Sequence, residues 1–278
     1  MSGDDPGMHY VLGHAPREMA RLERQAAIFE ATTRSLLTRC GIGPGQRVLD
    51  LGCGAGDVTL LVSDLVGPGG HVIGVDRAPE AVTTARGRAA GLGRRNVTFV
   101  ESTIEALDLP PVDAVVGRFV LMHQTAPAAA LAHAARLVRP GGVVAMMESH
   151  LDALVLEWHS WPASAAYTNL LDVMLRTIKA AGGRTDMGLR LRGTFLEAGL
   201  PDPAIDVHGT LAGSDAARLC RYMVDSLRSM AAMAERLGVE TLPPARIDDM
   251  ERGMLRDADR PGAVMNGPVV VTAWCQLP

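Results

Sequence analysis

The feature that most constrains the fold is an alternation of short apolar runs and stretches with helical periodicity between residues 47 and 148. Five apolar runs predict strands: "RVLDLG" (47–52), "HVIGVD" (71–76), "VTFVE" (97–101), "VDAVVG" (112–117) and "GVVAMME" (142–148). The stretches between them predict helices over residues 57–66, 78–91 and 126–138. Strands and helices that alternate at these lengths form βαβ units, so we expect an α/β fold with a parallel sheet and right-handed crossovers.

The sequence on either side of this region has a different pattern. Residues 15–39 have the apolar periodicity of an amphipathic helix. After residue 150, the pattern predicts helices over 151–181, 190–200, 214–237 and 244–257, and strands over 204–209 and 267–278. We therefore expect one domain in three parts. These are an N-terminal helical lid (1–40), a ligand-binding core (41–150) and helical cap insertions with the last strands of the same sheet (151–278).

Composition restricts the class of partner. The chain has 278 residues, 47% of them hydrophobic and 21% charged, with a formal net charge of −4. A nucleic-acid partner would require a clustered basic face, and no Lys- and Arg-rich tract is present. The four cysteines are far apart and form no CxxC pair, which argues against a zinc site or a disulfide framework. Without a leader-like start or an apolar run of membrane-spanning length, we expect a cytoplasmic protein with no membrane partner.

The glycine-rich turn after the first strand predicts the class of ligand. "GCGAGD" (52–57) follows a GxGxG pattern, whereas a dinucleotide loop has GxGxxG and directs a helix N-terminus at a pyrophosphate. Asp57 takes the position after the last glycine, and Asp50 precedes the loop. Two carboxylates would repel a pyrophosphate and suit a ligand with an ammonium and a sulfonium group. This interpretation argues against a nicotinamide oxidoreductase.

The stretch "VLDLGCGAGDVT" (48–59) resembles motif I of the class I S-adenosylmethionine (SAM) dependent methyltransferases. "DAVVGRFVLMHQ" (113–124) and "LVRPGGVVAMME" (137–148) resemble the family's fourth-strand segment and its turn into strand five. The resemblance covers residues 45–150. It implies a Rossmann-like, mostly parallel sheet of seven strands and SAM as the cofactor.

The same resemblance implies which residues surround that cofactor. Asp76 ends the second strand, where the family has an acidic residue that binds the ribose hydroxyls. Thr103 stands near the position of an Asp that usually contacts adenine, and its hydroxyl can accept the same hydrogen bond. Tyr10 lies in a segment that resembles the lid of small-molecule methyltransferases. The full cofactor set is Tyr10, Asp50, Gly52, Cys53, Gly54, Asp57, Asp76, Arg77, Thr103, Ile104, Arg118 and Phe119. For Arg118, a surface salt bridge stays open as an alternative to binding the cofactor carboxylate.

Three residues are candidates for the catalytic base. His123 follows the fourth strand, and Glu148 and His150 end the fifth, at the sheet edge where chemistry concentrates. Each also has a structural interpretation: His123 as a residue that packs at the end of a turn, and Glu148 or His150 as a helix cap.

Four residues are candidates for substrate binding: Trp158, His159, Tyr167 and Tyr222. Trp158 and Trp161 would share one face of a helix at i, i+3 and enclose an aromatic pocket, unless this is a buried packing cluster. The 14 methionines allow two interpretations, an adaptable pocket wall or ordinary core packing.

Helices on three sides of the sheet edge predict an enclosed pocket for a compact, largely apolar or aromatic molecule. We expect a methyl acceptor that reacts at oxygen or nitrogen. The alternatives are an electron-rich aromatic carbon such as that of an indole, or a SAM-binding protein that does not transfer methyl. The Arg-, Ala- and Gly-rich, Lys-poor composition favours a bacterial source and natural product biosynthesis. No metal is expected, and a homodimer stays open.

Overall fold

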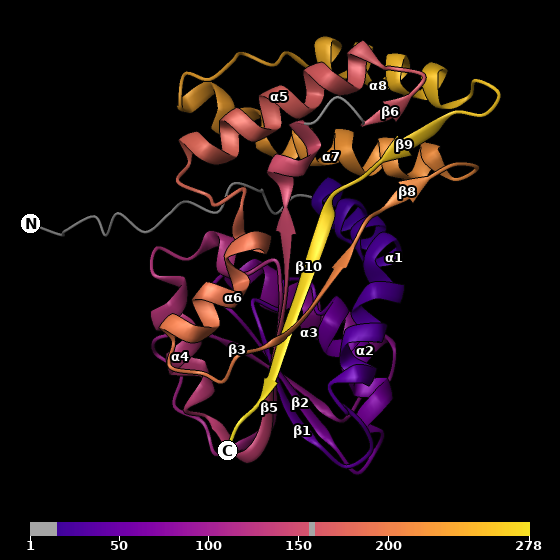
Figure 1. Ribbon diagram of the computed structural model, residues 1–278. Helices are drawn as coiled ribbons and strands as arrows, with labels where there is room; N and C mark the ends of the chain where they lie inside the picture. The colour runs from indigo at the N-terminus through magenta and orange to yellow at the C-terminus, as the bar shows by residue number, and fades with distance from the viewer. Residues whose placement is uncertain (1–15, 156–158) are drawn as a thin grey trace, which may run out of the picture.

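A computed structural model describes residues 16–155 and 159–278, and its centre is a seven-stranded sheet (Figure 1). The strand order is β3-β2-β1-β4-β5-β10-β7. Neighbouring strands from β3 to β5 are parallel, and β10 runs antiparallel to both β5 and β7. The bounds are Arg47–Leu51 for β1, His71–Asp76 for β2, Val97–Glu101 for β3, Val112–Arg118 for β4, Val138–His150 for β5, Ala204–His208 for β7 and Val269–Gln276 for β10. The expected Rossmann-like, mostly parallel sheet of seven strands is confirmed.

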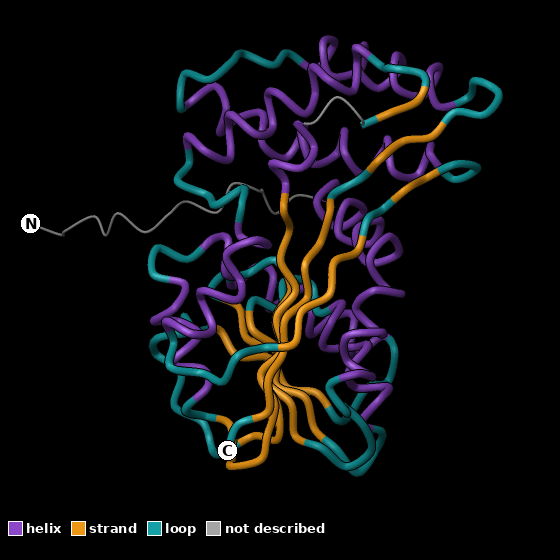
Figure 2. The backbone as a smooth tube through the Cα atoms, viewed as in Figure 1, coloured by secondary structure: helices purple, strands orange, loops and turns teal. Residues whose placement is uncertain are grey.

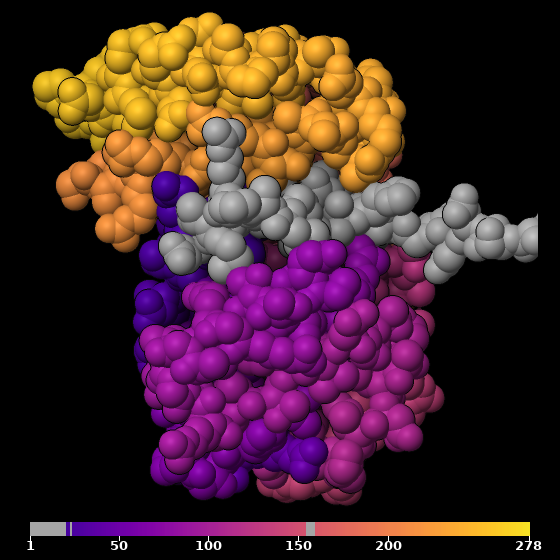
Figure 3. All heavy atoms as spheres, turned by 180° about the vertical axis from the view of Figure 1, so that it is seen from behind, coloured from indigo at the N-terminus to yellow at the C-terminus, as the bar shows by residue number. Residues whose placement is uncertain are grey.

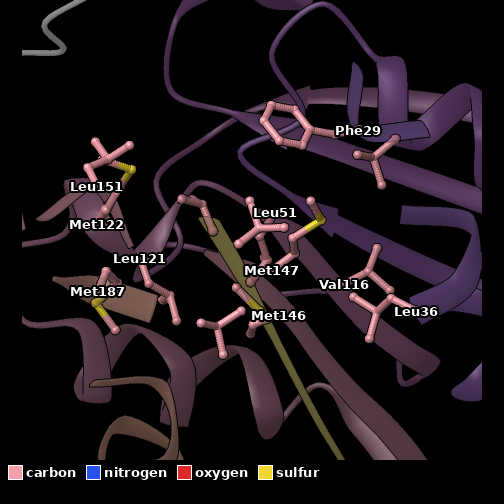
Figure 4. Packing of buried hydrophobic residues seen from close by; sticks show 14 of the residues in the cluster. Phe29, Leu36, Leu51, Val116, Leu121, Met122, Met146, Met147, Leu151 and Met187 are labelled. Carbon is pink, nitrogen blue, oxygen red and sulfur yellow. The ribbon is translucent and has the colours of Figure 1, made fainter. Parts of the chain in front are cut away.

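Helices cover both faces of this sheet, with α4 and α6 on one side and α1, α2 and α3 on the other (Figures 1 and 2). The bounds are Pro16–Arg39 for α1, Asp57–Val66 for α2, Pro79–Gly91 for α3, Pro127–Ala135 for α4 and Met187–Glu197 for α6. A strand covered on both faces needs apolar side chains in both directions. Accordingly Val48, Leu49 and Leu51 of β1 are fully buried. Figure 4 shows Leu36 of α1 beside Val116 of β4, and Phe29 of α1 and Met147 of β5 belong to the same buried apolar cluster.

A helical cap lies beyond the carboxyl ends of the parallel strands (Figure 1), and its orange and yellow segments form the top of the molecule when it is drawn as spheres (Figure 3). It contains α5 (Ala165–Ala180), α7 (Ala216–Arg236) and α8 (Pro244–Ala258), which pack on one another. Helix α7 also packs on α1, and the ion pair between Arg24 and Asp225 links these two helices. None of the helices that the structure describes is long and apolar enough to cross a membrane.

The segment expected to be helical over 151–181 is divided, so that prediction is wrong in part. A short 3-10 helix η2 (Leu151–Val155) is followed by β6 (Ser160–Trp161), and α5 begins only at Ala165. Pro162 cannot donate to a helical ladder, and Ser164 caps α5 by accepting from the amide of Tyr167 at 3.2 Å. Strand β6 belongs to a three-stranded antiparallel sheet, ordered β6-β9-β8, with β8 (Leu211–Ala212) and β9 (Val264–Asn266). Strands of two or three residues have no readable periodicity, which is why the sequence did not predict this sheet.

Candidate active site

A cavity of about 230 Å³ lies where the carboxyl ends of the parallel strands meet α1, α5 and α7. Ligands of open α/β sheets bind at this edge. The wall includes every described residue of the expected cofactor set: Asp50, Gly52, Cys53, Gly54, Asp57, Asp76, Arg77, Thr103, Ile104, Arg118 and Phe119. Tyr10, the remaining member, lies outside the described residues. Thr103 and Ile104 belong to the segment that follows β3.

The backbone conformation of the glycine loop after β1 requires glycine at Gly52 and favours it at Gly54. Gly52 has φ of +59°, and a Cβ there would lie 2.7 Å from Cγ2 of Val120. Gly54 has φ of +53° and no heavy atom within 4 Å of its Cβ position, so its backbone faces open space. The amide of Cys53 donates to the Val75 carbonyl at 2.8 Å, which ties the loop to β2. A ligand can therefore approach the loop at Gly54.

Asp76 connects two backbone segments at the rim of the cavity. One oxygen, Oδ2, accepts from the amide of Gly54 at 2.9 Å, and the other, Oδ1, accepts from the amide of Ala78 at 2.9 Å. The carboxylate thus fixes the glycine loop to the start of α3. Each oxygen has a second lone pair for a further donor.

Asp50 is almost completely buried at the end of β1 and accepts a hydrogen bond from the Thr59 hydroxyl at 2.6 Å. Burial raises its pKa to about 7, although the Thr59 bond and the charge of Arg118 act in the opposite direction. Asp50 is thus a weaker source of negative charge than an ordinary aspartate.

Asp57 does not offer a free negative charge to the ligand, which corrects the expectation drawn from the glycine loop. Its Oδ1 lies 2.8 Å from Nη2 of Arg88 on α3, and its Oδ2 lies 3.9 Å from Nη2 of Arg118. Arg88 also donates to the carbonyl of Ala55 at 2.6 Å. Asp57 and Arg88 together hold the glycine loop against α3. The charge of Asp57 thus gives little reason to exclude a pyrophosphate, and the GxGxG spacing of the loop remains as the sequence difference from a dinucleotide loop.

Arg118 lies inside the protein, so the alternative of a surface salt bridge is wrong. Its side chain is 10% exposed at the end of β4, and burial lowers its pKa. Nη1 donates to the Thr33 hydroxyl at 3.3 Å, and the next residue, Phe119, has φ of +57°. The Phe119 amide donates to the Met147 carbonyl at 2.8 Å, and its ring packs edge-on against Phe29. These contacts stabilise a backbone conformation that is unfavourable for a large side chain.

A second part of the wall is apolar and comes mostly from the cap. It contains Met122, Leu151, Met174, Ile178, Met223, Met230 and Pro268. Four methionines at one cavity fit the interpretation of an adaptable pocket wall, because an unbranched thioether fills irregular space. Tyr222, expected to bind substrate, also lines the cavity.

His123, at the end of the 3-10 turn η1 (Leu121–His123), lines the same cavity. Burial lowers its pKa to about 4, and the charges of Arg77 and Arg21 add to this effect. The imidazole is therefore neutral near pH 7.

Glu148 and His150 do not line the cavity, in contrast to the catalytic roles expected for them. Side chains alternate between the two faces of a strand, and the intervening Ser149 is the one that reaches the wall. Glu148 is completely buried and accepts hydrogen bonds from backbone amides of residues 120–122. The Nδ1 atom of His150 is buried without a hydrogen-bond partner.

The expected aromatic pocket around residue 159 is not formed by the described residues. Trp161 lies on strand β6 and is 74% exposed, so it shares no helical face with Trp158, which is outside the described residues. His159 lies 2.6 Å from the Thr168 hydroxyl and packs edge-on against Tyr167. Tyr167 is completely buried and donates to the Asn266 carbonyl at 2.6 Å. His159 and Tyr167 therefore stabilise the cap, and neither lines the cavity.

Several wall residues were not predicted. Arg21 and Gln25 project from α1, and Arg21 is 2% exposed with Nη1 3.1 Å from the Gln25 amide oxygen. Their i, i+4 spacing beside the apolar stripe of α1 was the available signal. Nothing in the sequence pattern indicated that Ser149 and Ser226 would line the cavity. Among the residues with described positions, no group of three His, Cys, Asp or Glu side chains is placed to hold a metal ion.

Comparison with known proteins agrees with this geometry. A family model described as a methyltransferase domain matches residues 42–187. An uncharacterised 37.1 kDa protein in transposon TN4556 of Streptomyces fradiae is 32% identical over 193 residues, which is 68% of this chain and 54% of that protein. A ubiquinone/menaquinone biosynthesis C-methyltransferase of Coxiella burnetii is 36% identical over 115 residues, which is 40% of this chain and 46% of that enzyme. The chain thus spans about half the length of these curated relatives.

A solved structure shares the fold. The [4+2]-cyclase SpnF aligns with a TM-score of 0.54 at 20% identity, covering 89% of this chain and 80% of that chain. The family model covers more than half of the 278 residues, including the glycine loop, Asp76 and the whole parallel part of the sheet. The chain therefore belongs to the methyltransferase domain family, with the fold of the class I SAM-dependent methyltransferases.

Proposed function

We propose that this protein transfers a methyl group from SAM to a small, largely apolar or aromatic acceptor, at oxygen or nitrogen. One observation carries the proposal: a single cavity includes both the glycine loop with Asp76 and the apolar wall with His123. Two reactants can be held together in such a cavity, and alignment is the main contribution that a protein makes to this displacement.

The residues present fit the cofactor. Gly54 leaves open space beside its backbone, and the Asp76 oxygens keep lone pairs for ribose hydroxyls. Arg118 is placed inside the cavity wall, where its guanidinium can bind a carboxylate. Ile104 offers an apolar surface to a base, and the Thr103 hydroxyl offers an acceptor. SAM, when bound, supplies an electrophilic methyl group on a sulfonium.

The remaining steps belong to the chain's own side chains. The apolar wall excludes water from the acceptor, and its methionines adapt to the acceptor's shape. His123 is neutral and is the candidate residue on the wall for receiving the proton that an attacking hydroxyl or amine releases, although burial and the charges of Arg77 and Arg21 lower its pKa to about 4 and make it a weak base. Glu148 and His150 do not reach the cavity, so this role falls to His123.

A carbon acceptor is the second candidate, because the Coxiella burnetii relative is by name a C-methyltransferase. An aromatic carbon needs alignment more than a base, and the same apolar wall would provide it. A further alternative is a protein that binds SAM without transferring methyl.

The proposal extends to the organisation of the molecule. Residues 1–40 act as a lid, residues 41–150 bind the cofactor, and the cap within 151–278 selects the acceptor. We also propose a bacterial, cytoplasmic enzyme of natural product biosynthesis that has no nucleic-acid or membrane partner, and the oligomeric state is open between a monomer and a homodimer.

Incubation with methyl-labelled SAM and a panel of phenols, amines and indoles tests the proposed reaction. Mass spectrometry of the products locates the label on oxygen, nitrogen or carbon. We expect a labelled phenol or amine. Tight binding of S-adenosylhomocysteine without any product across the panel would favour the non-methylating alternative.

A further inference from the structure

Glu148, near the end of β5, is a buried carboxylate that contacts backbone. It is 0% exposed, and its partners are three consecutive backbone amides. Oε1 accepts from Val120 at 2.9 Å and from Leu121 at 2.7 Å, and Oε2 accepts from Met122 at 3.3 Å. Among the described residues, no cationic side chain forms an ion pair with it.

The three amides belong to the turn that carries part of the cavity wall. Val120, Met122 and His123 all line the cavity. The turn follows Phe119, whose φ of +57° is unfavourable and must be held by its surroundings. Buried amides without an acceptor are costly, so the turn needs a partner in the protein interior. Glu148 is that partner.

We propose that Glu148 is a positioning residue for the acceptor. Its carboxylate fixes the turn at residues 120–122 and thereby places Met122 and His123 against the acceptor. This inference rests on the proposed methyltransferase function, although Glu148 itself touches neither reactant.

The arrangement explains why an acid stands at this position. An ionised carboxylate has two oxygens and can accept from all three amides, whereas a glutamine has one oxygen. The cost of burial is visible in the pKa of Glu148, which burial raises to about 7 against the effect of the three amides. A protonated carboxyl presents an O–H where one amide needs an acceptor, so the turn is held fully only in the ionised state.

The test uses the full chain with three substitutions. Glu148→Ala removes all three acceptors, and Glu148→Gln can keep Oε1 for Val120 and Leu121 while losing the bond to Met122. Leu191→Ala is the matched control, because Leu191 is completely buried on α6, does not line the cavity and will also lower stability. Each variant is measured by hydrogen exchange, by binding of S-adenosylhomocysteine and, with an acceptor found in the panel, by kinetics.

We expect Glu148→Ala to speed exchange of the amides at 120–122 at least tenfold and to raise the acceptor KM or lower kcat at least tenfold. Affinity for S-adenosylhomocysteine should change less than about threefold. Glu148→Gln should restore most of the kinetic loss and reduce the pH step near 7 in the acceptor KM; the step that remains belongs to Asp50, which lines the cavity and also has a pKa of about 7. Leu191→Ala should leave both exchange at 120–122 and the kinetics unchanged.

Unchanged exchange at 120–122 in Glu148→Ala would overturn the inference, and so would the same kinetic loss in Leu191→Ala. Hydrogen exchange needs no turnover, so a failure of the methyltransferase proposal is separable from a failure of this one. If Glu148→Ala does not fold, Glu148→Gln carries the test alone: slower exchange or unchanged exchange at Met122 would overturn the inference.

Discussion

The carboxylate of Asp57, at the first turn of α2, lies 2.8 Å from Nη2 of Arg88 on α3. The Asp57 side chain is 9% exposed and that of Arg88 is 27% exposed, so the pair is shielded from solvent. Arg88 also holds the Ala55 carbonyl in the glycine loop at 2.6 Å. The Arg88 guanidinium therefore joins three segments on the cofactor side of the cavity: the glycine loop, the start of α2 and α3.

Replacing that guanidinium should destabilise the protein and weaken cofactor binding. Arg88→Met leaves Asp57 poorly compensated in a largely buried position, and we expect a loss of about 1–3 kcal/mol in the free energy of unfolding. Urea denaturation measures this loss, and calorimetry with S-adenosylhomocysteine measures the affinity. The control is Arg94→Met, because the ion pair of Arg94 with Asp64 is between side chains that are 37% and 46% exposed. That substitution should cost less than about 1 kcal/mol. Equal losses in the two variants would contradict the prediction.

Asp76 should determine cofactor affinity. Asp76→Ala removes the acceptor for the Gly54 amide and for ribose hydroxyls, so we expect binding of S-adenosylhomocysteine to weaken by about 1–3 kcal/mol. Isothermal titration calorimetry gives the dissociation constant directly. Glu101→Gln is the control, because Glu101 ends the neighbouring strand β3 but is exposed and does not line the cavity. An unchanged dissociation constant in Asp76→Ala would remove Asp76 from the cofactor site.

S-adenosylhomocysteine and SAM should raise the melting temperature, and NADH should not. A ligand at one hundred times its dissociation constant stabilises the native state by about 2.7 kcal/mol. For a chain of this size that corresponds to a rise of roughly 5 °C. Differential scanning calorimetry with each ligand checks the prediction, and stabilisation by NADH alone would reverse the assignment of the glycine loop.

His123 should make stability fall at acidic pH. Its folded-state pKa of about 4 lies below the ordinary value of 6.5, because burial and the charges of Arg77 and Arg21 disfavour the imidazolium. The native state therefore binds fewer protons than the unfolded state between pH 6.5 and 4. Stability from His123 is present above pH 6.5 and is lost as the pH falls through this window, by at most about 3 kcal/mol.

Comparison with His123→Gln isolates this effect. Burial raises the pKa of Asp50 and that of Glu148 to about 7, so both carboxyls change stability in the opposite direction over the same window. The difference in unfolding free energy between the wild type and His123→Gln, measured by urea denaturation from pH 7 to 4, cancels their contribution. A difference that does not vary with pH would show that the imidazole is not held neutral.

The methionines that line the cavity should determine which methyl acceptors the protein can bind. Met230→Ala enlarges the cavity from the α7 side, so we expect a weaker hold on small acceptors and an improved kcat/KM for bulkier ones. Affinity for S-adenosylhomocysteine should not change. Met250→Ala is the control, since Met250 is buried on α8 without lining the cavity and its truncation has a similar cost in stability. The same change of acceptor preference in Met250→Ala would show that the wall is not responsible.

Local patterns predicted the sheet and the position of the cavity. Helices follow β1, β2 and β4 and a loop connects β3 to β4, so the strands are parallel and their carboxyl ends lie at one edge. Most of the expected cofactor residues follow these strand ends directly, so chain position was enough to bring them together.

Features that depend on contacts distant in sequence were not predictable. Asp57 is compensated by Arg88, a partner 31 residues away on another helix, so its charge is not available to the ligand as the loop sequence suggested. Glu148 and Ser149 differ by one position on β5, and only the pairing of the strand decides which of them faces the cavity. Tyr167 resembled a pocket residue by type, but its hydroxyl is used by the carbonyl of Asn266.

His150 at the end of β5 pairs with Val269 at the start of β10. The segment between these two positions contains the cap, α6 and the edge strand β7; it begins and ends at neighbouring points of the sheet. Replacing residues 151–268 with the corresponding segment of another family member would therefore require only two junctions, which lie side by side in the sheet. We expect such a chimera to methylate a different acceptor while residues 41–150, which surround the cofactor, keep their sequence.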